Sequence, residues 1–403
     1  MRAYFDHAAT SPMPAAVLAE YTEALALLGN PASTHAHGQF ASEQLESARE
    51  RIGRRLGADT ALVTLTAGGT ESINLALKGF YWAALKRQRR LNIESAPVLL
   101  VAEGEHHATI EAAEWLRDAQ GAELRFLPLD GEGVLQPETL RGVISDIGAE
   151  RIALVSFLWA NNEVGSLLPV RELAGIAREA GVASHIDAVA ALGQVPIDFT
   201  EVGADALSVS AHKIGGPVGV GALLLARHVT IESLVHGGSQ QRARSGTQNV
   251  AGAVAFAAAL DHAYGASDEA FSAKANRLRA LRDYLIAGVQ RAVPEAVLRG
   301  ARPGGAAGDP RLAGNAHFTF PGCQGDSLVF LLDVAGVSAS VGSACQAGVA
   351  EVSHVLLAMG VPEHEAIGSL RFTLSSETSE AEIDALIAAL PNAVFRARAA
   401  GLA

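Results

Sequence analysis

The chain has 403 residues, of which 49% are hydrophobic and 18% are charged, and its formal net charge at pH 7 is −12. This length and composition are typical of a folded protein with a large core, and the acidic balance argues against nucleic acid as a direct partner, because binding phosphates needs a basic surface. Charges interrupt the apolar stretches before they could span a membrane, and two cysteines, Cys323 and Cys345, are too few for a disulfide framework.

The N-terminal segment begins with a short strand and turn at 4–12, followed by a helix over about 14–28. Asp6 and His7 stand where an exported protein has the apolar core of its leader, so we expect a cytoplasmic protein with no membrane partner. The loop that comes next contains His35 and His37. This HxH pair suits either metal ligation or loop hydrogen bonding, and by itself it favours hydrogen bonding. We therefore predict no metal site.

Apolar strands alternate with helices from about residue 60 to residue 226. Continuous apolar strands separated by helices predict a mostly parallel sheet that helices cover on both faces, which is an α/β fold. The last of these strands is expected to return antiparallel, after a Gly/Pro turn. The expected strands are 61–66, 97–101, 151–157, 182–186, 205–210 and 221–225.

Polar residues follow these strands where each one ends. Since such sheets bind ligands beyond the carboxyl ends of their strands, these side chains should meet in one crevice. Some have a structural alternative: Asp187 as a helix N-cap and His106 as a hydrogen-bonded loop histidine. The residues expected to converge are Thr70, His106, Asn162, Asp187 and Lys213.

Lys213 differs from the three other lysines of the chain. Lys78, Lys86 and Lys274 lie in amphipathic helical patterns, where we expect them to be solvated. Lys213 instead follows the buried strand at 205–210, where desolvation lowers the pKa of an amine and makes it a usable nucleophile or base. The alternative for Lys213 is a structural lysine paired with a carboxylate.

The pattern changes after about residue 255. A long amphipathic helix with an acidic first turn runs over about 267–293. The segments 316–320 and 370–374 alternate like half-buried strands. We predict a large domain over 15–255 and a smaller α+β domain made of 1–14 and 256–403.

A phosphate site is predicted at the first turn from strand to helix. Residues 68–70 (Gly-Gly-Thr) open that helix, where free amides and the helix dipole attract an anion. The turn is neither a Walker loop nor a GxGxxG fingerprint, which disfavours nucleotides. Ser210 and His212 flank Lys213 and offer further phosphate donors. A phosphate, a desolvated lysine and the carboxylate of Asp187 together meet the needs of pyridoxal phosphate.

Cys345 lies in a run of small residues at 337–348. Nothing in this run could pack a core, so we expect an exposed loop, and exposure is what a nucleophilic thiol needs. Cys323 comes shortly after Phe318 and Phe320 and is expected to be structural.

Together these motifs resemble the pyridoxal-phosphate-dependent cysteine desulfurases, a branch of the class V aminotransferase family, and especially its actinobacterial-type members. The resemblance covers essentially the whole chain, and it implies fold type I of the pyridoxal phosphate enzymes, with a seven-stranded sheet. The matching motifs are DHAAT at 6–10, GNPAS at 29–33, GTES at 69–72, EHHA at 105–108, ANNE at 160–163, HIDA at 185–188, SAHK at 210–213, RSGT at 244–247 and GSAC at 342–345.

The resemblance also implies roles for single residues. Lys213 would bond to pyridoxal 5'-phosphate and remove the Cα proton of L-cysteine, while His106 would stack on the ring and assist proton transfer. Cys345 would take the sulfur as a persulfide and leave L-alanine, and the sulfur would pass to an iron–sulfur scaffold or a tRNA-thiolation protein. The other implied contacts are Gly69, Thr70, Asn162, Asp187, Ser210 and His212 to the cofactor, Thr247 to the cofactor from the other subunit of a homodimer, and Asn162 and Arg371 to the substrate carboxylate.

The chain departs from the family pattern in three places. Ala190 stands where the family has a glutamine that donates to the ring oxygen of the cofactor, and we expect its loss to slow turnover. The run at 237–241 differs from the usual Gly-Gly-Gly-Gln-Glu, and the segment before Arg244 is one residue short; 373–375 replaces the usual Ser-Leu-Gly. A related C–S lyase, a selenocysteine lyase or an aminotransferase on the same scaffold is the alternative. A non-catalytic assembly protein fits poorly with intact Lys213 and Cys345.

Overall fold

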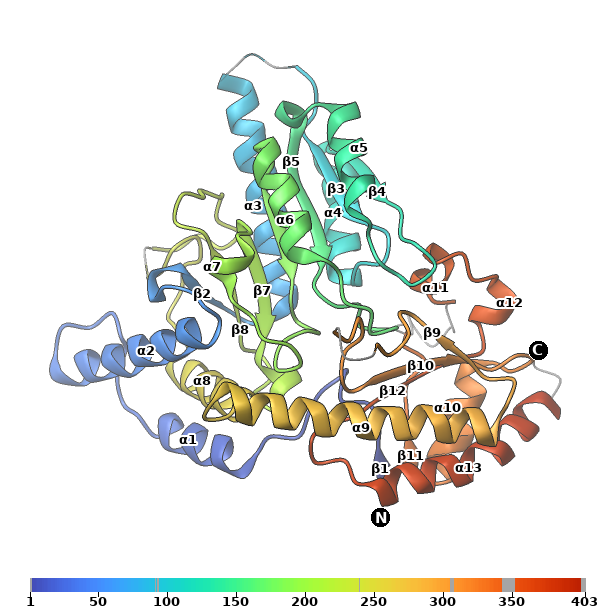
Figure 1. Cartoon of the computed structure of the whole chain (residues 1–403). Helices are drawn as coiled ribbons and strands as arrows, with labels where there is room; N and C mark the ends of the chain where they lie inside the picture. The colour runs from blue at the N-terminus through green and yellow to red at the C-terminus, as the bar shows by residue number, and fades with distance from the viewer. Residues whose placement is uncertain are drawn as a thin grey trace.

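A seven-stranded sheet forms the centre of the larger part of the molecule (Figure 1). The computed structural model describes residues 2–90, 92, 94–238, 240–304, 308–342 and 352–399. Within them the strand order is β2-β8-β7-β6-β5-β3-β4, and β8 runs antiparallel to both of its neighbours. The predicted α/β class, with a mostly parallel sheet and an antiparallel return strand, is confirmed. The strands are β2 (Val63–Thr66), β3 (Val98–Ala102), β4 (Glu123–Leu127), β5 (Ile152–Leu158), β6 (Ser184–Asp187), β7 (Ala206–Ser210) and β8 (Gly221–Leu225).

Helices cover both faces of this sheet. On β3, Leu99 and Val101 pack in the cluster that contains α3 and α4, whereas Leu100 packs on the opposite face with α2, α5, α6 and α8. Burial on both sides explains why the strands are continuously apolar. The helices of this part are α1 (Ala15–Leu25), α2 (Ala36–Arg55), α3 (Gly69–Arg90), α4 (His107–Gln120), α5 (Pro137–Ile147), α6 (Val170–Ala180), α7 (Phe199–Val202) and α8 (Val250–Tyr264).

The edge strand β4 was not among the strands expected from sequence. It pairs with β3 alone, and Glu123, Arg125 and Phe126 along it are partly or fully exposed. An edge strand with one open side has no continuous apolar run, so a search for buried strands passes over it. The central strands were found because both of their faces are buried.

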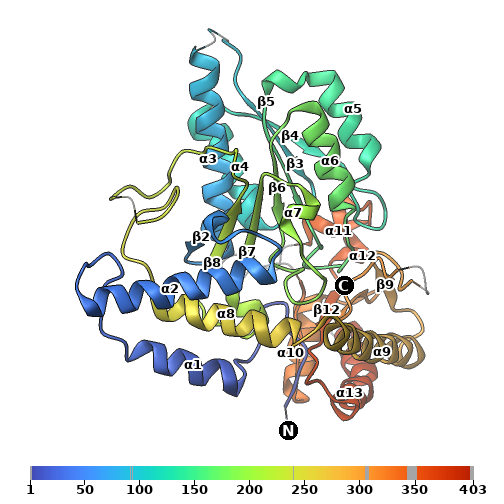
Figure 2. The same ribbon diagram turned by 60° about the vertical axis from the view of Figure 1, so that its left-hand side comes forward.

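The smaller part contains a three-stranded antiparallel sheet of order β12-β10-β9 and a parallel pair of short strands, β1 and β11. Figures 1 and 2 show α9, α10 and α13 packed around these strands. α9 has Phe271 in the core of the larger part and Leu278 in the core of the smaller part, so one helix joins the two. The elements are β1 (Ala3–Tyr4), α9 (Asp268–Ala292), β9 (Val297–Arg299), β10 (Asn315–Thr319), α10 (Gly325–Val334), β11 (Val337–Ser338), α11 (His354–Ala358), α12 (Glu363–Ala366), β12 (Ser369–Thr373) and α13 (Glu380–Ala399).

Two expectations for this part were wrong. The strands β10 and β12 alternate as predicted, but all their residues are buried and none is half-buried. Their apolar face joins the core of the smaller part, while polar side chains such as His317 and Arg371 are enclosed on the other face. The run at 337–348 is also not a loop throughout, because β11 pairs with β1 and Ser340 pairs with the backbone of Arg371.

Two further predictions fall outside what the structure tests. Cys345 lies in 343–351, outside the described residues. The domain limits at 14/15 and 255/256 stay predictions. Among the described helices, none combines the length and the apolar character that crossing a membrane requires.

Candidate functional site

A cavity of about 420 Å³ lies beyond the carboxyl ends of the parallel strands. The polar face of the small sheet closes its other side, with Asn315 and Arg371 in the wall. The structure brings the strand-end residues together as the sequence predicted, since all five of them line this cavity. The predicted residues in its wall are Gly69, Thr70, His106, Asn162, Asp187, Ser210, His212, Lys213 and Arg371.

Asp187 is the last residue of β6, and 2% of it is exposed. One carboxylate oxygen accepts a hydrogen bond of 2.9 Å from the backbone amide of Val189. Burial raises the pKa of Asp187 to about 6, although that amide and the charge of Lys213 oppose the shift. The alternative of a helix N-cap was wrong, because a turn follows β6 and α7 begins only at Phe199; Asp187 accepts a hydrogen bond within that turn and also lines the cavity.

Lys213 lies in the 3-10 turn Ala211–Ile214, directly after β7. Its Nζ donates hydrogen bonds to the backbone carbonyls of Ala8 and, at 3.2 Å, of Ala9. Burial lowers the pKa of Lys213 to about 8, the charge of Arg371 lowers it further, and Asp187 and Asp6 oppose the shift. The predicted desolvation is confirmed, and the amine's hydrogen-bond partners are carbonyl oxygens instead of a carboxylate.

The other lysines are less uniformly solvated than expected. Lys86 is exposed and pairs with Glu232 at 2.5 Å. Lys78 lies 4.4 Å from the centre of the Trp115 ring, and Lys274 donates to the carbonyl of Ala263 at 3.4 Å. Burial lowers the pKa of both Lys78 and Lys274, so the prediction of solvated amines was wrong for these two.

His106 caps the N-terminus of α4. Its Nδ1 accepts a hydrogen bond of 3.0 Å from the backbone amide of Ala108, which leaves Nε2 to carry the proton of the neutral ring. Desolvation by the surrounding protein, and next the charge of Lys213, lower the pKa of His106 to about 4. The side chain nevertheless borders the cavity, so it presents a neutral imidazole there at neutral pH.

The anion end of the cavity is formed by the start of α3 and by Ser210. The Oγ of Ser210 is buried and has no hydrogen-bond partner within the described residues. A Cβ on Gly69 would lie 2.8 Å from the side chain of Val189, so the first turn of α3 can pack this closely against Val189 because the position has no side chain. An unpaired hydroxyl beside helix amides, with Lys213 and Asp187 in the same cavity, fits a phosphate-bearing pyridine such as pyridoxal phosphate.

Arg371 crosses from β12 to the end of β5. Its guanidinium donates to the backbone carbonyl of Asn162 at 2.8 Å and pairs with Asp6 at 2.9 Å. Its Nε and the Oδ1 of Asn162 are buried and have no partner within the described residues. Asp6 therefore already neutralises the arginine to which the resemblance assigns the substrate carboxylate, a pairing that sequence reasoning missed because 365 positions separate the two.

Glu105 is a second carboxyl that sequence reasoning missed. It is fully buried, and its Oε1 accepts a hydrogen bond of 2.6 Å from the amide of Leu158. Burial first, and the charge of Asp187 second, raise the pKa of Glu105 well above its usual value. Its place before His106 in the motif at 105–108 was the one available signal. A raised pKa favours the protonated form of Glu105, and protonation removes its repulsion of the Asp187 carboxylate.

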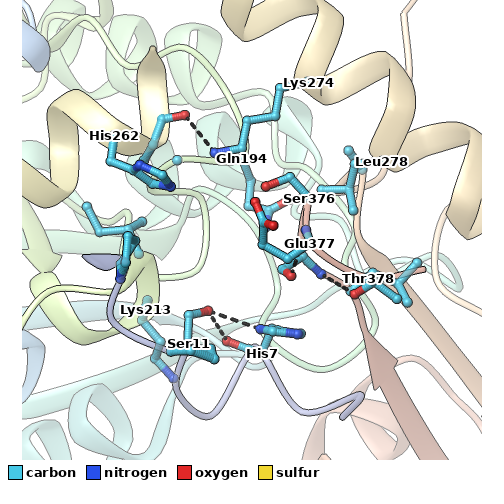
Figure 3. A pocket seen from close by; sticks show the side chains of 18 of the residues that line it. His7, Ser11, Gln194, Lys213, His262, Lys274, Leu278, Ser376, Glu377 and Thr378 are labelled. Carbon is cyan, nitrogen blue, oxygen red and sulfur yellow. Dashed lines mark hydrogen bonds between the residues drawn. The ribbon is translucent and has the colours of Figure 1, made fainter. Parts of the chain in front are cut away.

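A larger cavity of about 570 Å³ lies next to the first. In Figure 3, Lys274 and His262 lie on one side of it and Lys213 and His7 on the other, with Glu377 between them. Lys213 therefore separates two cavities, which no sequence pattern indicated. The residues common to both are His7, Leu192, Gln194, Lys213 and Leu374.

The remaining predicted residues lie away from the cavity. Thr247 is exposed and does not line it, so its contribution from a second subunit stays a prediction. Cys323 is 1% exposed and lies 3.8 Å from the carbonyl of Val394, which confirms its structural place. His35 caps α2 by accepting the amide hydrogen of Gly38, as loop hydrogen bonding predicted. The described residues hold no cluster of three or more side chains suited to a metal.

Comparisons with known proteins agree with this geometry. The sequence pattern of the class-V aminotransferases matches residues 3–386. The IscS-like cysteine desulfurase of Mycobacterium tuberculosis is 47% identical over 406 aligned residues, which cover 100% of this chain and 98% of that protein. The cysteine desulfurase IscS of Dictyoglomus turgidum is 36% identical, covering 98% of this chain and 95% of its own. Among solved structures, a NifS-like protein superposes with a TM-score of 0.86 at 32% identity, covering 98% of this chain and 100% of its own.

Proposed function

The chain belongs to the class-V aminotransferase family and is a cysteine desulfurase, and on that premise we propose that it converts L-cysteine into L-alanine with pyridoxal 5'-phosphate as cofactor. The proposal rests on 47% sequence identity to a cysteine desulfurase along the whole chain. It also rests on Lys213 and Asp187, which line the same cavity. We further propose iron–sulfur scaffold or tRNA-thiolation proteins as sulfur acceptors, and a cytoplasmic location.

The residues of the cavity suit the cofactor at each end. When bound, pyridoxal phosphate supplies an electron sink that makes the Cα proton of an amino acid acidic. The amides of Gly69 and Thr70 and the hydroxyl of Ser210 would hold the phosphate. Asp187 would keep a proton on the ring nitrogen, and His106, as a neutral ring beside Lys213, would cover the ring face.

Lys213 is the proposed base. With a pKa of about 8, a fraction of its amine is neutral at neutral pH, and a base with a pKa near the working pH is the most effective. The carbonyls of Ala8 and Ala9 accept hydrogen bonds from its Nζ and so orient the amine at the cavity. Lys213 would then take the Cα proton of L-cysteine and return a proton to carbon after sulfur has left.

Arg371 and Asn162 are the proposed partners of the substrate carboxylate. Because Asp6 already pairs with Arg371, a bound carboxylate would share the guanidinium with it. The Nε of Arg371 has no partner among the described residues, so it is a donor available to a carboxylate. Asp6 therefore weakens the attraction for carboxylates while it keeps the buried guanidinium neutralised.

Cys345 is the proposed acceptor of sulfur. Its thiolate attacks the substrate sulfur, so that an S–S bond forms while the Cβ–S bond breaks. The electron pair of the broken bond stays with the substrate carbon, which is protonated to give alanine. The residue lies outside the described part of the chain, so the assignment rests on the motif at 342–345.

The test supplies L-cysteine and measures alanine and sulfide for the wild type, Cys345→Ser and Lys213→Ala. We expect alanine from the wild type, little from Cys345→Ser and none from Lys213→Ala. Alanine release that survives Cys345→Ser unchanged would refute the persulfide route. A purified protein that is colourless, and in which borohydride labels no lysine, would refute the cofactor.

We also propose that the active form is a homodimer in which Thr247 of one subunit reaches the cofactor phosphate of the other. Thr247 is exposed and away from the cavity of its own chain, which supports a contribution across an interface. α1 and α2 also expose large apolar side chains, as a subunit interface would. These are Leu18, Leu25 and Phe40.

A further inference from the structure

The larger cavity, of about 570 Å³, has no part in the proposed reaction except that Lys213 borders it. It lies between the two cores, with α8 and the N-terminal half of α9 in one wall and the segment 374–378, which follows β12, in another. Charged groups of both signs enter it, but much of its lining is apolar. The large apolar side chains in the lining are Met13, Leu192, Phe271, Leu278 and Leu374.

Lys274 lines this cavity from α9 and is half-buried. Within the described part of the chain it forms no ion pair, and its one hydrogen bond is to the carbonyl of Ala263, at 3.4 Å. Burial lowers the pKa of Lys274, while the charge of Glu377 opposes the shift. A partly desolvated ammonium with one long hydrogen bond would be stabilised by a carboxylate bound in the cavity.

Glu377 brings the opposite charge into the same cavity, as Figure 3 shows. Its charge acts on both Lys274 and His262, yet its carboxylate has no hydrogen-bond or ion-pair partner among the residues that the structure describes. The backbone around it is fixed, because Arg277 of α9 donates to the carbonyls of the residues before and after Glu377, at 3.3 and 3.4 Å. The amide of Glu377 also donates to the Oγ of Ser375 at 3.2 Å. The carboxylate is therefore held near the ammonium of Lys274 without contacting it.

Gln194 supplies a third polar group. Its side chain lines both cavities, and its Oε1 is buried without a hydrogen-bond partner in the described ranges. A buried amide oxygen that lacks a donor costs free energy, and an N–H group of a ligand would remove that cost. The cavity therefore offers a cation for a carboxylate, and a carboxylate and an amide oxygen for an ammonium.

We propose that this second cavity binds a zwitterionic α-amino acid with an apolar side chain. Lys274 would bind its carboxylate, Glu377 would bind its ammonium, and the Oε1 of Gln194 would accept a further hydrogen from the ligand. The side chain of the amino acid would pack against the apolar lining. A ligand that carries only one charge would meet a repelling group as well as an attracting one, because both signs are present in the cavity.

The experiment titrates L-leucine into the borohydride-reduced holoenzyme in a calorimeter. Reduction fixes the cofactor on Lys213, so an added amino acid cannot bond to it, and the heat reports the second cavity. We expect one L-leucine to bind per chain, with affinity that rises from glycine through L-alanine to L-leucine as the apolar contact grows. N-acetyl-L-leucine and L-leucinamide each lack one of the two charges and should bind about tenfold more weakly or worse.

Two variants test the charged groups one at a time. Lys274→Gln and Glu377→Gln should each weaken the binding of L-leucine by about tenfold or more, while alanine formation from L-cysteine stays unchanged. The matched controls are Lys86→Gln and Glu232→Gln, which break an ion pair away from the cavity and should bind L-leucine like the wild type.

Three results would overturn the proposal: no saturable binding of L-leucine, unchanged binding in both cavity variants, or equal binding of the singly charged analogues. The analogues are tested on the wild type, so they decide the matter even where a variant does not fold. A protein on which borohydride fixes no cofactor would instead refute the proposed function. The same titrations of the untreated protein would then test the second cavity.

Discussion

Ser210 ends the strand β7 and Lys213 lies in the turn that follows it, and both carry polar groups that the protein alone does not satisfy well. The hydroxyl of Ser210 is buried and finds no hydrogen-bond partner among the described residues, and burial lowers the pKa of Lys213 to about 8. Such groups cost stability and are retained where a ligand completes them. The sequence predicted both positions because a polar residue directly after a buried strand is visible in the chain itself.

The substitution Ser210→Ala should separate stability from cofactor affinity. In the cofactor-free protein it removes an unpaired buried hydroxyl, so we expect the melting temperature to be unchanged or higher. In the loaded protein it removes a phosphate donor, so we expect weaker binding of pyridoxal phosphate and a smaller rise of the melting temperature on loading. Thermal melts and cofactor titrations check both effects. Equal affinity in both proteins would contradict the assignment.

Lys213 gives a pH-dependent prediction. The unfolded chain holds the lysine proton up to a pKa near 10.5, while the folded, cofactor-free protein loses it near 8. Between these values the unfolded state binds more protons, so the free energy of unfolding rises with pH. Below pH 8 the charged amine costs stability, and Lys213→Met should be more stable than the wild type by about 1–3 kcal/mol at pH 7. The difference should shrink toward pH 10.5 in urea unfolding. A stability difference between the two proteins that stays constant from pH 8 to pH 10.5 would contradict the lowered pKa of Lys213.

At the scale of elements, the central strands of the large sheet were predictable from sequence. For the small sheet, the alternation of β10 and β12 was predictable but the place of their polar face in the molecule was not. Burial on both faces gives β5 and β7 sequences that are mostly apolar and contain no charged residue. The alternation of β10 and β12 correctly indicated one polar face, but sequence does not show that this face closes the site. Pairings such as Asp6 with Arg371, or Ser353 with Glu163, depend on tertiary approach and leave no local pattern.

Asp6, in the N-terminal segment after β1, neutralises Arg371. We therefore expect its substitution to lower the stability of the protein while it strengthens substrate binding. Asp6→Asn keeps a hydrogen-bond acceptor for the guanidinium but removes its countercharge. We expect the melting temperature to fall, because a buried arginine loses its ion-pair partner. The KM for L-cysteine should fall severalfold, because Arg371 is left free for the substrate carboxylate. Steady-state kinetics and thermal melts test this, and a higher KM would contradict the role of Arg371.

At the scale of the whole molecule, two cores meet along α9 and two cavities meet at Lys213. The site lies between these cores, so residues from the whole length of the chain form it. If Thr247 reaches the cofactor of the other subunit, as proposed, residues of a second chain would also form the site. The helix α9 was predicted over about 267–293, but neither its joining of the two cores nor the second cavity was predictable, because each depends on how whole layers pack.

The proposed dimer can be tested by mixing two damaged proteins. Lys213→Ala lacks the base, and Thr247→Glu places a negative charge where the phosphate of the other subunit would lie. In a heterodimer one site keeps both native residues, so subunit exchange at equal amounts should restore about a quarter of wild-type activity. Mixtures that never exceed the sum of the separate proteins would contradict a shared site.

The contacts of the first ten residues limit the order in which parts of the protein can fold. Ala3 pairs with Val337, Thr373 donates its amide to the carbonyl of Phe5, and Asp6 pairs with Arg371. Residues 3–6 are therefore synthesised long before residues 337 and 371–373, with which they pair. Such long-range closure slows folding, and the cavity around Lys213 is completed only after β12 has been synthesised. Lys213 and the turn at 68–70 are therefore present in the nascent chain before the cavity that they line has formed.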